Sequence, residues 1–197
     1  MERLRVFIVA CLLTLVAATP ALAGHSEAEA MDSARRALIA MRVLAYDKAL
    51  VERNPGPTVT IVILSTSSVE SRSERELWQD GFALVPKIKV GGRPVRVVPL
   101  DFGSQKAFEA ALAKLAPAAV IVGSDLISEL DAVEKVTRGR RVLTISRRED
   151  AVRGGLGMAL VAGEQRDEIV INLEATRSEG VRFGAGLLQL ARIVESE

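Results

Sequence analysis

Residues 58–64 read T-V-T-I-V-I-L, an unbroken run of β-branched and leucine residues. A strand that is covered by helices on both faces has such a continuous apolar pattern, whereas a strand with one wet face alternates apolar and polar residues. Asn54-Pro55-Gly56-Pro57 stands directly before the run, and four Ser or Thr residues follow it. The run therefore predicts a strand buried on both faces of a sheet.

The order of a strand followed by a helix recurs along the chain. A hydrophobic spacing of three and four residues predicts the helices, and short apolar runs predict the strands. Pro94 lacks a backbone donor, so the strand that follows it is expected to begin late or to lie at an edge. The expected helices are residues 31–50, 68–84, 105–115 and 126–136, and the expected β segments are 87–90, 95–100, 118–122 and 141–145.

The pattern changes near the end of the chain. Residues 158–161 and 168–171 are short β-like runs separated by a short segment that includes Gly163 to Asp167, which predicts a hairpin. A helix-like stretch then breaks at Gly180, and residues 186–194 read as a second, apolar helix. We therefore expect one three-layer α/β/α domain with a mixed, mostly parallel sheet and a C-terminal β-hairpin plus helices.

The first 23 residues have the pattern of a secretory signal peptide. Arg3 and Arg5 precede an apolar stretch, and A-L-A ends at Ala23, where cleavage is expected. Residues 24–197 then form the mature domain, located in the periplasm and not inserted in the membrane, since no later apolar run approaches about 20 residues. Cys11 is the only cysteine; a lipidation site there is the alternative to a cleaved signal. Cleavage after Ala23 leaves a net charge of about zero, which argues against nucleic acid as a partner.

Polar residues follow several predicted strands. Ser65, Ser124 and Arg147 stand at such positions, and the carboxyl ends of parallel strands border the ligand crevice of an open α/β sheet. The alternative is helix capping, which uses the same hydroxyl residues. His25 is the only histidine and lacks a partner nearby in the sequence. We therefore predict no catalytic residue, no cofactor and no metal site.

The C-terminal third resembles the YfiR/HmsC family of exported bacterial proteins. The matching features are Gly154-Gly155 before a strand, I-V-I-N-L with Asn172, a helix to Gly180, and L-L-Q-L-A-R-I-V from Leu187. The helix that follows the signal, with R-V-L-A-Y-D at residues 42–47, fits the same family. The resemblance implies a periplasmic α/β protein without catalysis that binds an inner-membrane diguanylate cyclase and holds it inactive. Released cyclase would raise cyclic di-GMP and favour biofilm formation.

Two functions follow as hypotheses. The first is a non-catalytic regulator that restrains a membrane-bound diguanylate cyclase through its periplasmic portion, and a second copy of the chain is a further candidate partner. The alternative is a periplasmic small-ligand binding protein that uses the carboxyl ends of its parallel strands. Leu187 and Leu188 are expected to be mostly core, with any surplus apolar face left for a partner. The candidate contacts for a partner or ligand are Ser65, Ser124, Arg147, Asn172, Arg177, Leu187 and Leu188.

Overall fold

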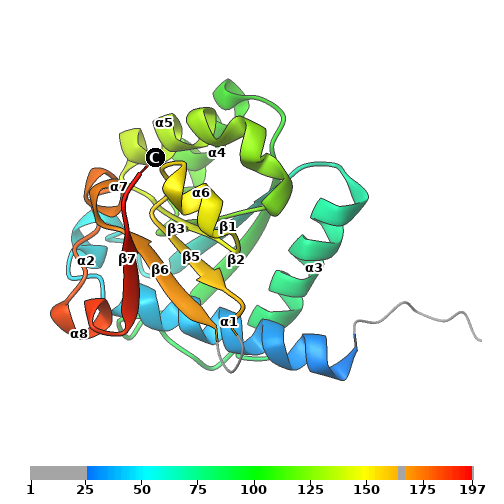
Figure 1. Cartoon of the computed structure of the whole chain (residues 1–197), viewed down its shortest axis with the longest axis horizontal. Helices are drawn as coiled ribbons and strands as arrows, with labels where there is room; N and C mark the ends of the chain where they lie inside the picture. Colours follow the sequence, from blue (N-terminus) through cyan, green and yellow to red (C-terminus); the bar gives the residue numbers. More distant parts are fainter. Residues whose placement is uncertain (1–25, 164–166, 197) are drawn as a thin grey trace, which may run out of the picture.

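The structure, a computed structural model, describes residues 26–163 and 167–196 (Figure 1). The signal peptide expected at residues 1–23, together with Cys11, Ala23 and His25, lies outside the described residues. Among the described helices, none is both long and apolar enough to cross a membrane.

Seven strands form one mixed sheet in the order β2-β1-β3-β4-β5-β6-β7. The first five are mutually parallel, β6 runs antiparallel to β5, and β7 is parallel to β6. The expected single α/β domain with a mostly parallel sheet and an antiparallel hairpin is thereby confirmed. The strands are β1 (Val59–Ser65), β2 (Val95–Asp101), β3 (Ala119–Val122), β4 (Leu143–Ser146), β5 (Met158–Val161), β6 (Glu168–Asn172) and β7 (Ala191–Val194).

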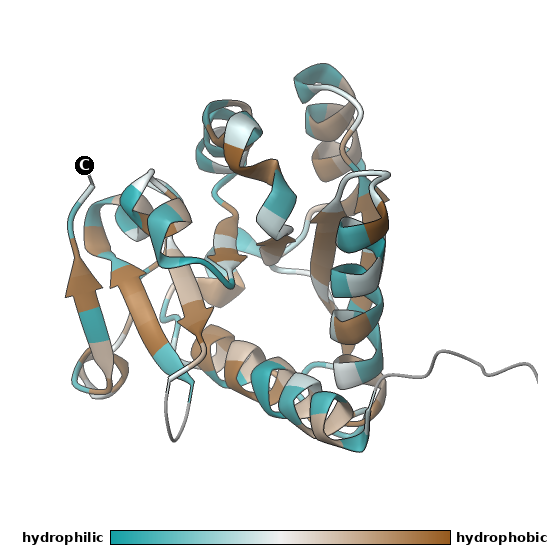
Figure 2. Ribbon diagram, turned by 45° about the vertical axis from the view of Figure 1, so that its right-hand side comes forward, coloured by the Kyte–Doolittle hydropathy of each residue, from teal (hydrophilic) through white to brown (hydrophobic). Residues whose placement is uncertain are grey.

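Helices cover both faces of this sheet, as Figure 1 shows. Alternate residues of β1 explain why: Ile61 and Ile63 pack with α1 (Glu27–Ala45) and α3 (Val69–Ala83), while Val62 and Leu64 pack with α4 (Gln105–Leu115) and α5 (Leu130–Arg140). All seven residues of β1 are buried, as its continuous apolar run predicts. In Figure 2 the strands are mostly brown, and the helices show teal on their exposed turns. The remaining helices are α2 (Leu50–Arg53), η1 (Ser124–Glu129), α6 (Glu149–Arg153), α7 (Leu173–Ser178) and α8 (Ala185–Leu188).

Several helix starts are set by hydroxyl caps. Ser68 accepts a hydrogen bond from the backbone N–H of Ser71 and begins α3, and Ser104 does the same for α4 through Ala107. Ser26 and Glu29 form a reciprocal capping box at the start of α1. Capping is therefore confirmed for two of the strand-to-helix turns.

The first predicted helix is too long, because the chain turns at Asp47. Its carboxylate accepts hydrogen bonds from the N–H groups of Ala49 and Arg182, both at 2.9 Å, and pairs with Arg53 at 2.7 Å. These contacts satisfy a buried carboxylate that a continuous helix would have left unpaired, so α1 ends at Ala45. The β segment expected at residues 87–90 forms only an isolated bridge between Val90 and Arg93. The helix expected at 126–136 divides into the 3₁₀ turn η1 and α5.

The helix predicted over residues 186–194 is wrong. α8 ends at Leu188, and the chain continues as β7, whose register pairs Ile169 with Ala191 and Asn172 with Val194. Strand β6 would otherwise present unpaired backbone groups at the sheet edge, and hydrogen bonding to them outweighs the helical spacing of the leucines. Leu187 is buried as expected and Leu188 is half-buried, but Leu190 is 68% exposed.

Candidate functional site

Ser65 and Ser124 lie at the point where the sheet reverses its winding. β1 is flanked by β2 on one side and by β3 on the other, so the carboxyl ends of β1 and β3 border the crevice where open α/β sheets bind ligands. The Ser65 hydroxyl accepts a hydrogen bond from Arg75 at 3.2 Å. The N–H and hydroxyl of Ser124 both donate to Glu74, at 2.9 and 3.2 Å. Side chains of α3 therefore already engage both predicted contacts.

A carboxylate from the chain itself occupies this crevice. Asp125 accepts hydrogen bonds from the hydroxyls of Thr66, Ser68 and Ser71, the last two at 3.0 and 2.9 Å. We call these four residues the Asp125 cluster. Burial acts to raise the pKa of Asp125, but the three hydroxyl donors together outweigh it and hold the pKa below its ordinary value. The hydroxyl donors at this point of the sheet edge are therefore paired within the fold.

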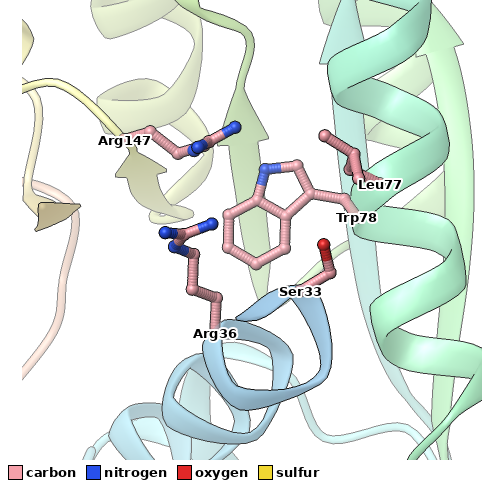
Figure 3. Close-up of a pocket in the computed structure, with 5 residues that line it drawn as sticks. All are labelled: Ser33, Arg36, Leu77, Trp78 and Arg147. Carbon is pink, nitrogen blue, oxygen red and sulfur yellow. The ribbon is translucent and has the colours of Figure 1, made fainter. Parts of the chain in front are cut away.

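Arg147 reaches a different place on the same edge of the sheet. It follows β4 and lines a small hollow, with about 10 Å³ open to a water-sized group, together with Ser33, Arg36, Leu77 and Trp78 (Figure 3). In Figure 3 the guanidinium groups of Arg36 and Arg147 both point toward the Trp78 ring, with the indole nitrogen on the Arg147 side. We call this the Trp78 hollow. Two arginines, one indole and one hydroxyl thus converge from α1, α3 and the end of β4.

The donors of the Trp78 hollow are incompletely paired. Trp78 is 3% exposed, and its Nε1 is buried without a hydrogen-bond partner among the described residues. Arg36 donates through Nε to Asp167 at 3.3 Å. Across residues 26–163 and 167–196, no hydrogen bond or ion pair is recorded for Arg147. A buried N–H without an acceptor costs about 1–3 kcal/mol, so an added acceptor would be favourable here.

A close helix crossing shapes this hollow. At Gly81 the backbone of α3 approaches α1 so tightly that an added Cβ would overlap the carbonyl oxygen of Ser33. Trp78 lies one turn before Gly81 and stacks on Phe82, with ring centroids 6.1 Å apart. The crossing presses Trp78 against α1 and leaves its indole nitrogen facing the space toward Arg147.

Sequence reasoning missed a fully buried acid, Glu179. It is 0% exposed and accepts hydrogen bonds from the N–H and hydroxyl of Thr144, at 3.0 and 2.5 Å. Burial raises its pKa to about 8, against the smaller opposing effect of these donors. The only local signal was Gly157, whose position leaves no space for a Cβ beside the Glu179 carboxylate.

A polar cavity of about 550 Å³ lies between α5, α6 and α7. Glu134 and Arg138 line it and pair at 2.7 Å, with side chains 13% and 39% exposed. Burial of Glu134 raises the pKa of its carboxyl group, against the opposing effect of Arg138. No three His, Cys, Asp or Glu side chains within the described ranges are grouped as metal ligands would be.

The other predicted contacts lie apart from the Trp78 hollow. Asn172 is buried and caps α7 through Ala175, while its amide donates to Val152 and Ser196, so its contacts are within the fold. Arg177 is exposed and shares a hollow of about 460 Å³ with half-buried Leu188. Leu187 belongs to the core. As contacts for a partner or ligand, all seven residues remain predictions.

Solved structures share this fold at low sequence identity. A ligand-free, open substrate-binding protein with adhesive properties from Clostridium difficile matches with TM-score 0.50 and 13% identity, over 71% of this chain and 55% of that one. An ABC domain in complex with L-Trp from Streptococcus pneumonia matches with TM-score 0.52 and 14% identity, over 77% and 62%. A conserved domain protein from Vibrio cholerae matches with TM-score 0.58 and 12% identity, over 82% and 59%. The chain thus spans less than two thirds of these proteins, and the likeness concerns the fold.

No curated protein matches the sequence. The YfiR/HmsC-like family model, in contrast, matches residues 34–192, from α1 to β7. This range covers most of the described domain, including the C-terminal segment whose motifs resemble the family. The chain therefore belongs to the YfiR/HmsC-like family.

Proposed function

We propose that this protein is a non-catalytic periplasmic regulator that binds and restrains a membrane-bound diguanylate cyclase, and so lowers cyclic di-GMP and biofilm formation. The observation that carries the proposal is the family match over residues 34–192. Export through a signal peptide cleaved after Ala23 is part of the proposal, and N-terminal sequencing of the mature protein tests it.

The open edge of the sheet suits a protein partner. β7 pairs with β6 along one side, and Leu190 and Ile193 are 68% and 43% exposed there. Arg192 lies between them in the sequence and pairs with Glu149 and Glu168, so charged groups lie beside the apolar side chains. An exposed strand edge with apolar side chains accepts a partner strand or an apolar surface. We assign the contact with the cyclase to β7 and residue 190.

Co-purification from envelope extracts in mild detergent tests this assignment. The full-length protein should recover a membrane cyclase, and the double variant Leu190→Lys, Ile193→Lys should lose it and raise cellular cyclic di-GMP. Val51→Lys is the matched control, because Val51 is equally exposed but lies on α2. Recovery of the cyclase by the β7 variant would exclude this edge, and recovery of no cyclase by the wild type would overturn the proposed function. Sedimentation of the pure protein tests the predicted homodimer.

A second candidate function is recognition of a small ligand at the carboxyl edge of the sheet. The indole N–H of Trp78, which has no acceptor among the described residues, favours it, because one bound acceptor could pair with both this N–H and Arg147. In a regulator, such a ligand would serve as the input signal.

A further inference from the structure

We propose that the Trp78 hollow binds the carboxylate group of a small organic acid. The proposal rests on the second candidate function and gives its ligand a chemical class. Cyclase binding is a separate question, because the hollow is formed by α1, α3 and the end of β4, whereas the proposed partner contact is on β7.

The lining selects an acceptor. An indole N–H and a guanidinium group can only donate hydrogen bonds, and the Ser33 hydroxyl can do either. Trp78 Nε1 is buried with no acceptor recorded among the described residues, so the missing group must bring an oxygen lone pair. A cation or a donor group would leave the indole N–H unpaired and would face two arginines. The occupant is therefore an oxyanion.

The charged side chains around the hollow favour a ligand group with a single negative charge. Asp167, whose side chain is 1% exposed, offsets Arg36 and is shared with Arg35, at 3.3 and 3.1 Å. Arg147 has no recorded acidic partner in residues 26–163 and 167–196. One guanidinium without an acidic partner among the described residues matches a carboxylate better than a phosphate dianion, and the forked donors of arginine fit its two coplanar oxygens.

The size of the hollow limits what enters. Only about 10 Å³ of it is open to a water-sized group, far below the range of about 300–1,000 Å³ typical of pockets that enclose a whole ligand. The carboxylate head would enter between Trp78 and Arg147, and the rest of the acid would remain toward solvent.

The single tryptophan makes a direct test available. A ¹H–¹⁵N spectrum of the labelled protein contains one indole signal, that of Trp78. Sodium acetate should move this proton downfield in a saturable way, whereas sodium chloride at the same ionic strength should not. Arg147→Gln should weaken acetate binding about tenfold or more, because a hydrogen bond to a charged group contributes about 1.5–3 kcal/mol. Arg148→Gln is the matched control: Arg148 is the next residue, is exposed and pairs with Asp150. It should bind acetate like the wild type.

Three results would overturn the proposal, and they have different meanings. If phosphate saturates the signal at lower concentration than acetate, the hollow binds an anion of another class and the ligand function stands. If neither anion shifts the indole proton, the second candidate function fails as well. If Arg147→Gln leaves acetate binding unchanged, the acetate contact is adventitious. None of these results alters the outcome of the cyclase co-purification.

Discussion

The Asp125 cluster and the Trp78 hollow are two groups of donors at the same edge of the sheet, and α3 contributes to both. In the first, three hydroxyls point to a carboxylate that the chain supplies. In the second, an indole N–H and the Arg147 guanidinium lack a recorded acceptor within the described residues. Two turns of one helix separate Ser71 from Trp78. The difference teaches that polar residues at strand ends are candidates for ligand binding only where no other group of the fold pairs with them.

The largest expected effect concerns Glu179. Its carboxyl group accepts hydrogen bonds, as that of Asp125 does, but is fully buried. Its folded pKa of about 8 lies above the ordinary 4.5, so the protonated form favours folding. This contribution is complete below pH 4.5 and is lost as the pH rises through about 8. Unfolding free energy should therefore fall by on the order of 3 kcal/mol between pH 5 and 8.

Urea unfolding across this pH range measures the slope. Glu179→Gln, which cannot ionise, should remove most of it, whereas Glu174→Gln, at an exposed position on α7, should retain it. An identical slope in Glu179→Gln would show that donors from Thr144 keep the acid ionised despite burial. In Glu179, as in Asp125, the hydrogen-bond donors would then outweigh burial in setting the pKa of the carboxyl group.

The next effect is the helix crossing that shapes the Trp78 hollow. Gly81→Ala should lower the unfolding free energy by about 2–3 kcal/mol, because the new methyl group would push against the backbone of α1. It should also alter the indole signal of Trp78 and leave the Asp125 cluster intact.

Gly139→Ala is the matched control for this change. Gly139 lies in α5 with nothing close to an added Cβ, so the variant should be neutral or about 0.5 kcal/mol more stable. Chemical denaturation of both variants measures the difference. Equal stability of the two would mean that α1 and α3 can separate freely.

A smaller effect is expected from the Asp125 cluster. Asp125→Ala should cost about 1 kcal/mol, since the hydroxyls of Thr66, Ser68 and Ser71 can turn partly to water. The pKa of Asp125 is lowered, so its contribution is present above about pH 4 and is lost as the pH falls further. Thermal unfolding should therefore separate wild type and variant more at pH 7 than at pH 3. Asp131→Ala, an exposed acid on α5, should show no such pH-dependent separation.

The smallest expected effect is that of Arg147→Gln on stability. Because Arg147 makes no hydrogen bond or ion pair with the described residues, the unfolding free energy should stay within about 0.5 kcal/mol of wild type. Calorimetry without added ligand measures this value. A large loss would give Arg147 a structural role, and the contrast between the two regions would then disappear.

The sequence predicted the sheet well because apolar runs report burial on both faces. β1, α4 and the β5–β6 hairpin lie where those runs and the short segment around Gly163 placed them. It failed at residues 191–194, where helical leucine spacing competes with an open neighbouring strand that only the folded sheet provides. It also failed at Asp47, whose partners Arg53 and Arg182 become neighbours through folding.

The candidate site was predictable in part. Arg147 was found because it follows a predicted strand, but Ser65 and Ser124, chosen on the same ground, are engaged by Arg75 and Glu74 of α3. The position of a residue at the end of a strand predicts the edge of the sheet on which it lies. Its hydrogen-bond partners depend instead on how α3 lies across that edge. Ser33, Arg36 and Trp78 carried no local signal, because their convergence arises from the α1–α3 crossing.

The last strand has a consequence for how the molecule opens. β7 is joined to the sheet by four register pairs with β6, and two of its four side chains are exposed. β1, in contrast, is paired on both sides and fully buried. Amide hydrogens of residues 191–194 should therefore exchange with solvent through local fraying, whereas those of β1 exchange through global unfolding. The C-terminal strand is the element that the protein can detach and reattach while its core stays folded.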